Sequence, residues 1–143
     1  MDKKVFLIKS DTDYAMRILV HLALSDGDEP IPAGVLVEKQ GVPVDFAYKI
    51  LQKLCKAKIL KSYKGVSGGF VLAKDPEQIS LLDVIDAIQG RIIIRPCLLG
   101  DSNCASAKPC PVSLKLQQLQ ETLDSEMQGI TLAKIIQIKR NNC

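Results

Sequence analysis

Apolar residues recur every three or four positions along most of the chain, which is the spacing of one buried face of an α-helix. The pattern predicts six helices, over residues 12–25, 32–40, 46–58, 81–90, 112–128 and 132–139. Three of these helices have a capping residue at the expected N-terminus. The residues are Ser10 or Asp11 for the first helix, Ser80 for the fourth and Thr131 for the last.

A short hairpin is predicted after the third helix, whose buried stripe is expected to be Phe46, Ile50, Leu51 and Leu54, with Cys55 beside them. Two strand-like runs, Ile59-Leu60 and Phe70-Val71-Leu72, flank the glycine-rich tip KGVSGG. The second and third helices, with Gly41 in the turn between them, form a helix-turn-helix signature, and a basic hairpin beside such a pair serves as a wing.

We therefore expect a mainly α protein. A winged helix-turn-helix DNA-binding domain with a small β-hairpin wing would occupy residues 1–90. A cysteine loop would occupy residues 91–111, and a long dimerisation helix with a C-terminal segment would occupy residues 112–143.

The long helix carries a narrow apolar seam. Leu116, Leu119, Leu123 and Met127 step by three, four and four residues, as in a coiled coil. The flanking positions are polar, with Gln120 among them. This pattern favours a symmetric homodimer, and the alternative is a helix that packs on its own domain.

Composition excludes several classes of protein. The 143 residues are 47% apolar, which is enough for a core, and only 4% aromatic, which argues against a stacking-based single-strand binder. No apolar run approaches the roughly 20 residues of a membrane span, and the N-terminus lacks a cleavable signal. We expect a cytoplasmic protein without a membrane partner, in which the five cysteines stay reduced.

The net charge of +3 is mild, but basic charge is concentrated in one segment. Residues 41–75 contain seven lysines and two aspartates, so this segment carries +5 and the rest of the chain −2. Such a distribution indicates a surface that faces a polyanion such as double-stranded DNA. The alternative is a solvated lysine-rich face.

Three cysteines, Cys97, Cys104 and Cys110, are spaced C-x6-C-x5-C in a segment rich in Gly, Asn, Ser and Pro. Three soft sulfur ligands suit zinc or an iron–sulfur cluster. The C-x2–4-C knuckles of common zinc sites are absent. Cys55 lies on the stripe of the third helix and is expected in the core.

Four stretches resemble one family: DTDYAMRIL, VPVDFAYKILQKL, GVSGGFVLAKDP, and the three-cysteine loop followed by a long helix and ITLAKII. This is the family of small bacterial winged-helix regulators that includes the iron–sulfur cluster regulator and the nitric-oxide-sensing repressor. The resemblance implies a homodimer that holds one cluster per subunit and binds a nearly palindromic operator. It also implies that Cys97, Cys104 and Cys110 are cluster ligands.

The chain departs from the cluster regulator at the position three residues after the third cysteine, where Ser113 replaces a histidine. In the nitric-oxide sensor, an aspartate of the partner's opening helix supplies the fourth ligand, and the matching residue here is Asp13. The cofactor is expected to be a 2Fe–2S cluster, with 4Fe–4S as the alternative.

On the DNA side, the N-terminal polar residues of a recognition helix face base edges in the major groove, and here these are Asp45, Tyr48 and Lys49. The wing contributes Lys64, where the family often has an arginine that enters the minor groove. The remaining wing candidates are Ser67, Gly68 and Gly69, which let the backbone approach phosphate or serve the hairpin geometry alone.

The sequence thus predicts a dimeric transcription regulator, a repressor, whose operator affinity depends on an iron–sulfur cluster that senses redox state, nitric oxide or iron–sulfur supply. The alternative is a cluster-free regulator of the same fold, controlled by thiol oxidation or a partner enzyme. The chain has no nucleophile–base pair and no phosphate-binding glycine loop, so we do not expect an enzyme.

Overall fold

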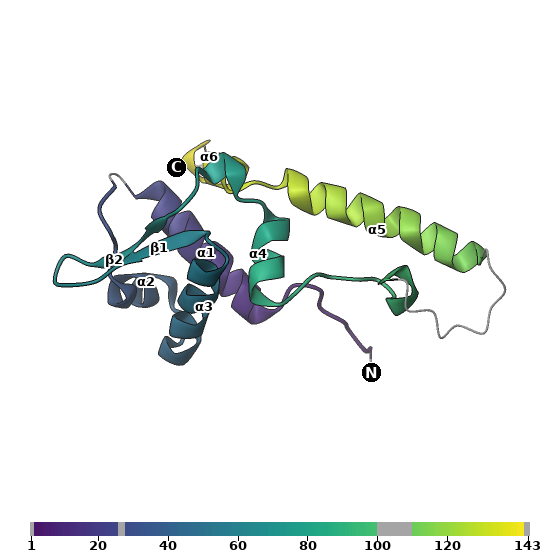
Figure 1. Cartoon of the computed structure of the whole chain (residues 1–143), viewed down its shortest axis with the longest axis horizontal. Helices are drawn as coiled ribbons and strands as arrows, with labels where there is room; N and C mark the ends of the chain where they lie inside the picture. Colours follow the sequence, from purple (N-terminus) through teal and green to yellow (C-terminus); the bar gives the residue numbers. More distant parts are fainter. Residues whose placement is uncertain (1, 26–27, 100–109, 142–143) are drawn as a thin grey trace.

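A computed structural model of the chain describes residues 2–25, 28–99 and 110–141 (Figure 1). The helices are α1 (Ser10–Leu24), α2 (Ala33–Gln40), α3 (Val44–Lys56), α4 (Leu81–Ile88), α5 (Pro111–Gly129) and α6 (Leu132–Asn141). The strands β1 (Leu60–Tyr63) and β2 (Gly69–Leu72) form an antiparallel hairpin, and 3-10 turns occur at η1 (Pro76–Gln78) and η2 (Pro96–Leu99). The predicted fold class, mainly helical with a small hairpin, is confirmed.

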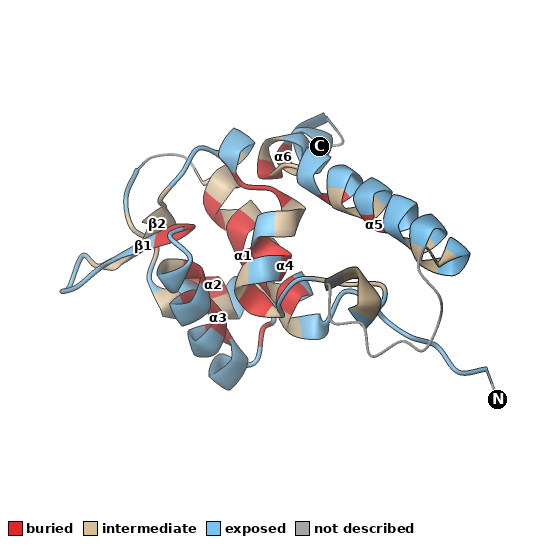
Figure 2. Cartoon of the chain, turned by 45° about the vertical axis from the view of Figure 1, so that its right-hand side comes forward, coloured by how far each residue is buried: buried red, intermediate tan, exposed pale blue. Residues whose placement is uncertain are grey.

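Helix α1 is the centre of the core and packs against α2, α3, α4, α6 and β2. Its residues Ala15, Ile18 and Leu19 are fully buried, and Figure 2 shows that buried positions gather on α1, α3 and α4. Removing these aliphatic side chains from water supplies the main favourable free energy of the fold.

The helix-turn-helix pair consists of α2 and α3. Gly41 ends α2 in the left-handed conformation, with φ of +62°, as the sequence predicted. The predicted stripe of α3 is wrong at one position, because Phe46 is 52% exposed and Ala47 is buried in its place. The helix begins at Val44, and the four residues Ala47, Ile50, Leu51 and Leu54 follow the spacing of the buried face.

The hairpin is held against the rest of the domain by backbone hydrogen bonds to the segment before α2. Ile31 and Phe70 each donate an N–H to the carbonyl of the other, at 3.0 and 2.9 Å. Gly69, next to this bridge, has φ of +154°, and a Cβ there would collide with the backbone of Ile31. The close approach therefore requires glycine.

Two of the three predicted caps are confirmed. Ser80 forms a capping box with Asp83 at the start of α4, and Thr131 accepts the N–H of Lys134 at 3.3 Å in α6. The cap predicted for α1 is wrong, because Ser10 already lies inside the helix and Lys9 is the N-cap, without a side-chain cap bond.

Helix α5 projects from the domain, and α6 returns to it (Figure 1). Leu81 donates to the carbonyl of Ile130 and Leu132 donates to that of Ile79, both at 2.8 Å. Leu132 and Ile136 of α6 are buried in the common core. The C-terminal helix therefore packs with the winged helix-turn-helix.

Among the residues that the structure describes, no helix is both long enough and apolar enough to cross a bilayer.

Gly41→Ala should lower the free energy of unfolding by about 1 kcal/mol, because the left-handed backbone conformation is unfavourable for alanine. A Cβ at this position meets no atom within 4 Å, so steric collision contributes nothing. Gly34→Ala is the matched control, since Gly34 in α2 also has open space but no positive φ. Urea denaturation should show the loss for Gly41→Ala only, and equal stabilities of the two variants would contradict this account.

Candidate nucleic-acid interface and cysteine site

The outward face of α3 carries the residues predicted to read DNA. Asp45, Tyr48 and Lys49 are all exposed, and the opposite face of α3 packs on α1. Phe46 is exposed beside them and was missed by sequence reasoning, which assigned it to the core. An apolar side chain at the start of a recognition helix is suited to contact a thymine methyl group.

The wing presents a second exposed surface. Lys64 and Ser67 are exposed at the turn between β1 and β2. Steric constraints within the chain require glycine at positions 68 and 69. A Cβ at Gly68 would collide with the carbonyl oxygen of Tyr63, and a Cβ at Gly69 would collide with the backbone of Ile31. The hairpin therefore needs both glycines whether or not DNA is bound.

All seven lysines of the basic segment are exposed, and one of them bonds to another helix of the domain. Lys53 donates from Nζ to the carbonyl of Ile88 at 3.0 Å, at the C-terminal end of α4, where the helix dipole favours a cation. The other six are Lys49, Lys56, Lys58, Lys61, Lys64 and Lys74. The ion pairs within the described ranges, Asp13–Arg17 and Arg91–Asp124, do not involve these lysines, so their charge is available to an external polyanion.

Two of the three predicted cluster ligands lie at the same end of α5. Cys97 is in η2, Cys110 is the N-cap residue of α5, and both are half-buried. The Cys97 Sγ lies 3.9 Å from the Oγ of Ser113, in the first turn of α5. Cys104 lies outside the described residues.

The donor side chains that the structure describes here, Cys97, Cys110 and Ser113, suit an iron–sulfur cluster. Two soft sulfur donors and a hydroxyl gather beside the N-terminus of a 19-residue helix, whose dipole favours negative charge such as that of thiolates. Within the described parts of a single chain, no three Cys, His, Asp or Glu side chains are grouped closely enough to hold a metal ion.

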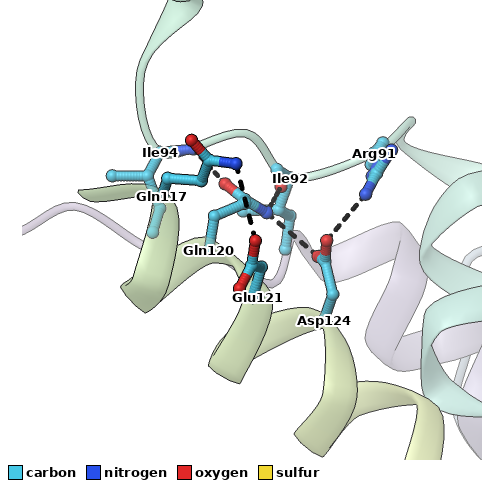
Figure 3. A network of polar contacts seen from close by, with 7 residues as sticks. All are labelled: Arg91, Ile92, Ile94, Gln117, Gln120, Glu121 and Asp124. Atoms are coloured by element: carbon cyan, nitrogen blue, oxygen red, sulfur yellow. Dashed lines mark hydrogen bonds and ion pairs between the residues drawn. The ribbon is translucent and has the colours of Figure 1, made fainter. Parts of the chain in front are cut away.

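The segment that leads to Cys97 is hydrogen-bonded to α5 through the buried side-chain amide of Gln120 (Figure 3). Gln120, 7% exposed, accepts the N–H of Ile94 at 2.8 Å and donates to the carbonyl of Ile92 at 2.9 Å and to Asp124 at 2.9 Å. Asp124 also pairs with Arg91 at 2.6 Å, and this contact raises the pKa of the Arg91 guanidinium.

The sequence interpretation of Gln120 as a polar flank of the seam was wrong. Its inward position depends on how residues 91–94 pass along α5, and the pattern of α5 alone carries no signal for that contact.

Asp13 lies in the first turn of α1 and forms an ion pair with Arg17 at 2.9 Å. The side chains of both are about half exposed (51% for Asp13), so the carboxylate is accessible to a second chain. His21, further along α1, is half-buried, and burial followed by the charges of Lys39 and Lys139 lowers its pKa. The imidazole is therefore neutral at pH 7.

Cys55 on α3 is half-buried against the core, and burial raises the pKa of its thiol. The raised pKa favours the protonated thiol, and the contact with the core agrees with the role expected from the sequence.

The Rrf2 family, described as iron-dependent transcriptional regulators, matches residues 8–138 of the chain. The protein belongs to the Rrf2 family. A protein of Aquifex aeolicus assigned as an HTH-type transcriptional regulator is 30% identical over 139 residues, which cover 95% of this chain and 96% of the relative. The HTH-type transcriptional regulator IscR of Yersinia pseudotuberculosis is 28% identical over 123 residues, covering 86% of this chain and 74% of IscR.

Solved structures share the fold. CymR, the global cysteine regulator of B. subtilis, superposes with a TM-score of 0.76 at 19% identity over 94% of this chain and 98% of CymR. T. potens IscR superposes with a TM-score of 0.73 at 20% identity, over 94% of this chain and 88% of IscR.

Membership of the Rrf2 family confirms the resemblance found in the sequence. The protein is a DNA-binding transcriptional regulator and, like these relatives, not an enzyme. The assignments of individual ligands and DNA contacts stay predictions.

Gln120→Ala should lower the free energy of unfolding by about 1–3 kcal/mol, because it leaves the polar backbone groups of Ile92 and Ile94 without their partner. Gln117→Ala is the control, since Gln117 is exposed and makes a single 3.5 Å contact with Glu121. Thermal and urea denaturation of both variants would measure the difference. A loss below about 0.5 kcal/mol for Gln120→Ala would exclude the structural role of the amide.

Proposed function

We propose that this Rrf2 protein is a homodimeric repressor whose operator affinity is set by an iron–sulfur cluster held by Cys97, Cys104 and Cys110. The observation that carries the proposal is the packing of η2 on the first turn of α5, which brings Cys97 and Ser113 to 3.9 Å, three residues from Cys110. When bound, the cluster would supply an iron centre that changes on exposure to oxygen, nitric oxide or iron shortage.

Dimerisation through α5 is supported by its exposed stripe. Val112 is 65% and Leu119 is 55% exposed, and Leu116 and Leu123 lie half-buried on the same side of the helix. Met127, the last residue of the predicted seam, is buried within its own chain and lies where α5 rejoins the domain. The stripe from Val112 to Leu123 is therefore the part that a second α5 would cover.

The cysteine site can influence the DNA-binding surface through a continuous set of contacts. Residues 91–94 run from α4 towards Cys97 and are bonded to Gln120 and Asp124 of α5. The carbonyl of Ile88, at the end of α4, accepts a hydrogen bond from Lys53 of the recognition helix. A shift of η2 against α5 would thus be passed to α4 and then to α3.

The fourth ligand that we propose is Asp13 of the partner subunit. Its bond to Arg17 is an exposed ion pair between residues four apart, and such pairs contribute about 0.3–0.5 kcal/mol, so ligation could break it at small cost. Ser113, which already contacts Cys97, is the competing oxygen donor. A 2Fe–2S centre suits this ligand set, and 4Fe–4S is the alternative.

Protein purified without air should contain iron and labile sulfide, and Mössbauer spectroscopy should report a cluster with one iron site that differs from the sulfur-only sites. Cys97→Ser and Cys110→Ser should lose the iron, whereas the control Cys55→Ser should retain it.

Asp13→Ala should change the resonance Raman spectrum, and Ser113→Ala should not. Colourless, iron-free wild-type protein would overturn the cluster and favour a cluster-free, thiol-controlled regulator.

Operator affinity should differ between the cluster-bearing and apo forms at matched salt. Equal affinities would leave the cluster without a regulatory role, while DNA binding itself would stand.

Lys64→Ala should weaken binding to a duplex selected from a random-sequence pool and lower the slope of log affinity against log salt by about one, because one phosphate contact is lost. Lys139→Ala is the charge-matched control, since Lys139 is exposed on α6 rather than on the wing. Fluorescence anisotropy across a salt series measures both quantities. An unchanged slope for Lys64→Ala would remove this residue from the interface.

A further inference from the structure

A cavity of about 250 Å³ lies where α1 packs against α2 on one side and against α6 on the other. None of its lining residues belongs to the basic segment 41–75 or to the cysteine loop. In Figure 1 these three helices lie at the opposite side of the molecule from the start of α5. The volume is below the roughly 300–1,000 Å³ of sites that hold drug-sized ligands, so the cavity suits a smaller molecule.

One part of the cavity wall is apolar. It consists of three half-buried side chains from α1 and α6: Met16, Val20 and Ile135. Met16 and Val20 also pack against the core of the domain, which holds this part of the wall in place. Such a wall favours a short aliphatic group, because aliphatic carbon gains free energy when it leaves water.

The rest of the wall is polar and carries positive charge. Its side chains come from all three helices: Arg17, His21, Gln40 and Lys139. Burial, and then the charges of Lys39 and Lys139, lower the pKa of His21, so both lysines lie close to the imidazole. Among the described residues, no carboxylate lines the cavity, and the wall therefore does not neutralise its own charge.

Arg17 is held at the edge of the cavity by two contacts on its own helix. Its guanidinium pairs with Asp13 at 2.9 Å and lies 5.9 Å from the centroid of the Tyr14 ring. A guanidinium has several N–H donors, so the bond to Asp13 leaves donors for a second carboxylate. The ion pairs within the described chain do not involve Lys39 or Lys139, so their charges are also available.

We propose that this cavity binds a small aliphatic carboxylate that carries no amino group. The carboxylate would meet Arg17 and Lys139, and the aliphatic part would lie against the apolar wall. The α-ammonium group of a free amino acid would meet the same cations with no acid in the wall to accept it, so amino acids are disfavoured. The site does not involve the cysteine loop or a second chain, so it is independent of the function proposed above.

His21 reports on the site directly, because it is the only histidine of the chain and gives a single imidazole signal in NMR spectra. Isocaproate should shift that signal and raise the pKa of His21, since a bound anion favours the charged imidazolium. Isocaproamide, which lacks the charge, and leucine, which adds an amino group to isocaproate, should do neither at the same concentration. Sodium chloride at matched ionic strength is the control for screening.

Lys139→Gln should weaken isocaproate binding about tenfold, because the carboxylate loses one charged partner. Lys115→Gln is the matched control, since it removes the same charge from an exposed position on α5, and it should leave the affinity unchanged. Gln40→Glu should abolish binding and raise the pKa of His21 without any ligand, because it places a carboxylate in the wall. Circular dichroism should show native helix content for all three variants.

A His21 signal that does not move in isocaproate, or that responds equally to isocaproamide, leucine or sodium chloride, would overturn the proposal. Equal affinities of Lys139→Gln and Lys115→Gln for isocaproate would also overturn it. A response to duplex DNA but not to isocaproate would assign these cations to the DNA interface instead. Iron content and operator affinity are measured separately, so none of these results would decide the proposed function.

Discussion

The arrangement of the functional parts depends on the polar bonds made where α4 ends. Three residues between positions 88 and 91 bond to groups from four different elements. The Thr12 hydroxyl among these groups is fully buried, where an unpaired polar group is costly. The carbonyl of Ile88 accepts a hydrogen bond from Lys53 of α3, and Arg91 pairs with Asp124 of α5. Gln89 bonds to the backbone of Leu7 and Lys9, before α1, and to the hydroxyl of Thr12 in α1. This short segment thereby holds the recognition helix α3, the N-terminal residues 2–9 and the long helix α5 in fixed directions relative to one another.

The continuation of that segment positions the cysteines. Because Gln120 is bonded to both Ile92 and Ile94, residues 91–94 run alongside α5, and η2 then meets the first turn of the same helix. Cys97 and Cys110, which have twelve residues between them in the sequence, lie at the same end of α5 for this reason. In the proposed mechanism, a change at the thiols reaches α4 because the connecting residues 91–94 are hydrogen-bonded to α5.

The exposed surfaces are separated along the molecule. The hairpin lies at one end of the view in Figure 1 and the outer half of α5 at the other. Such a separation lets a DNA-facing surface and a subunit-facing surface be occupied at the same time. The exposed lysines of residues 41–75 lie on or near α3 and the hairpin, and α5 exposes Val112, Leu114 and Leu119.

The sequence by itself determined the local structure: the helices, the hairpin, the glycine that ends α2 and the caps at Ser80 and Thr131. Each depends on periodicity or on groups within a few residues, and the Rrf2 motifs are equally local strings. The tertiary structure decided the burial of Gln120, the bond of Lys53 to the end of α4, the exposure of Phe46 and the return of α6 to the core. These features arise from contacts between segments that lie far apart in the sequence, more than a hundred residues in the case of α1 and α6. Whether a side chain faces a neighbouring segment or water depends on the path of that segment, which the pattern of one helix does not contain.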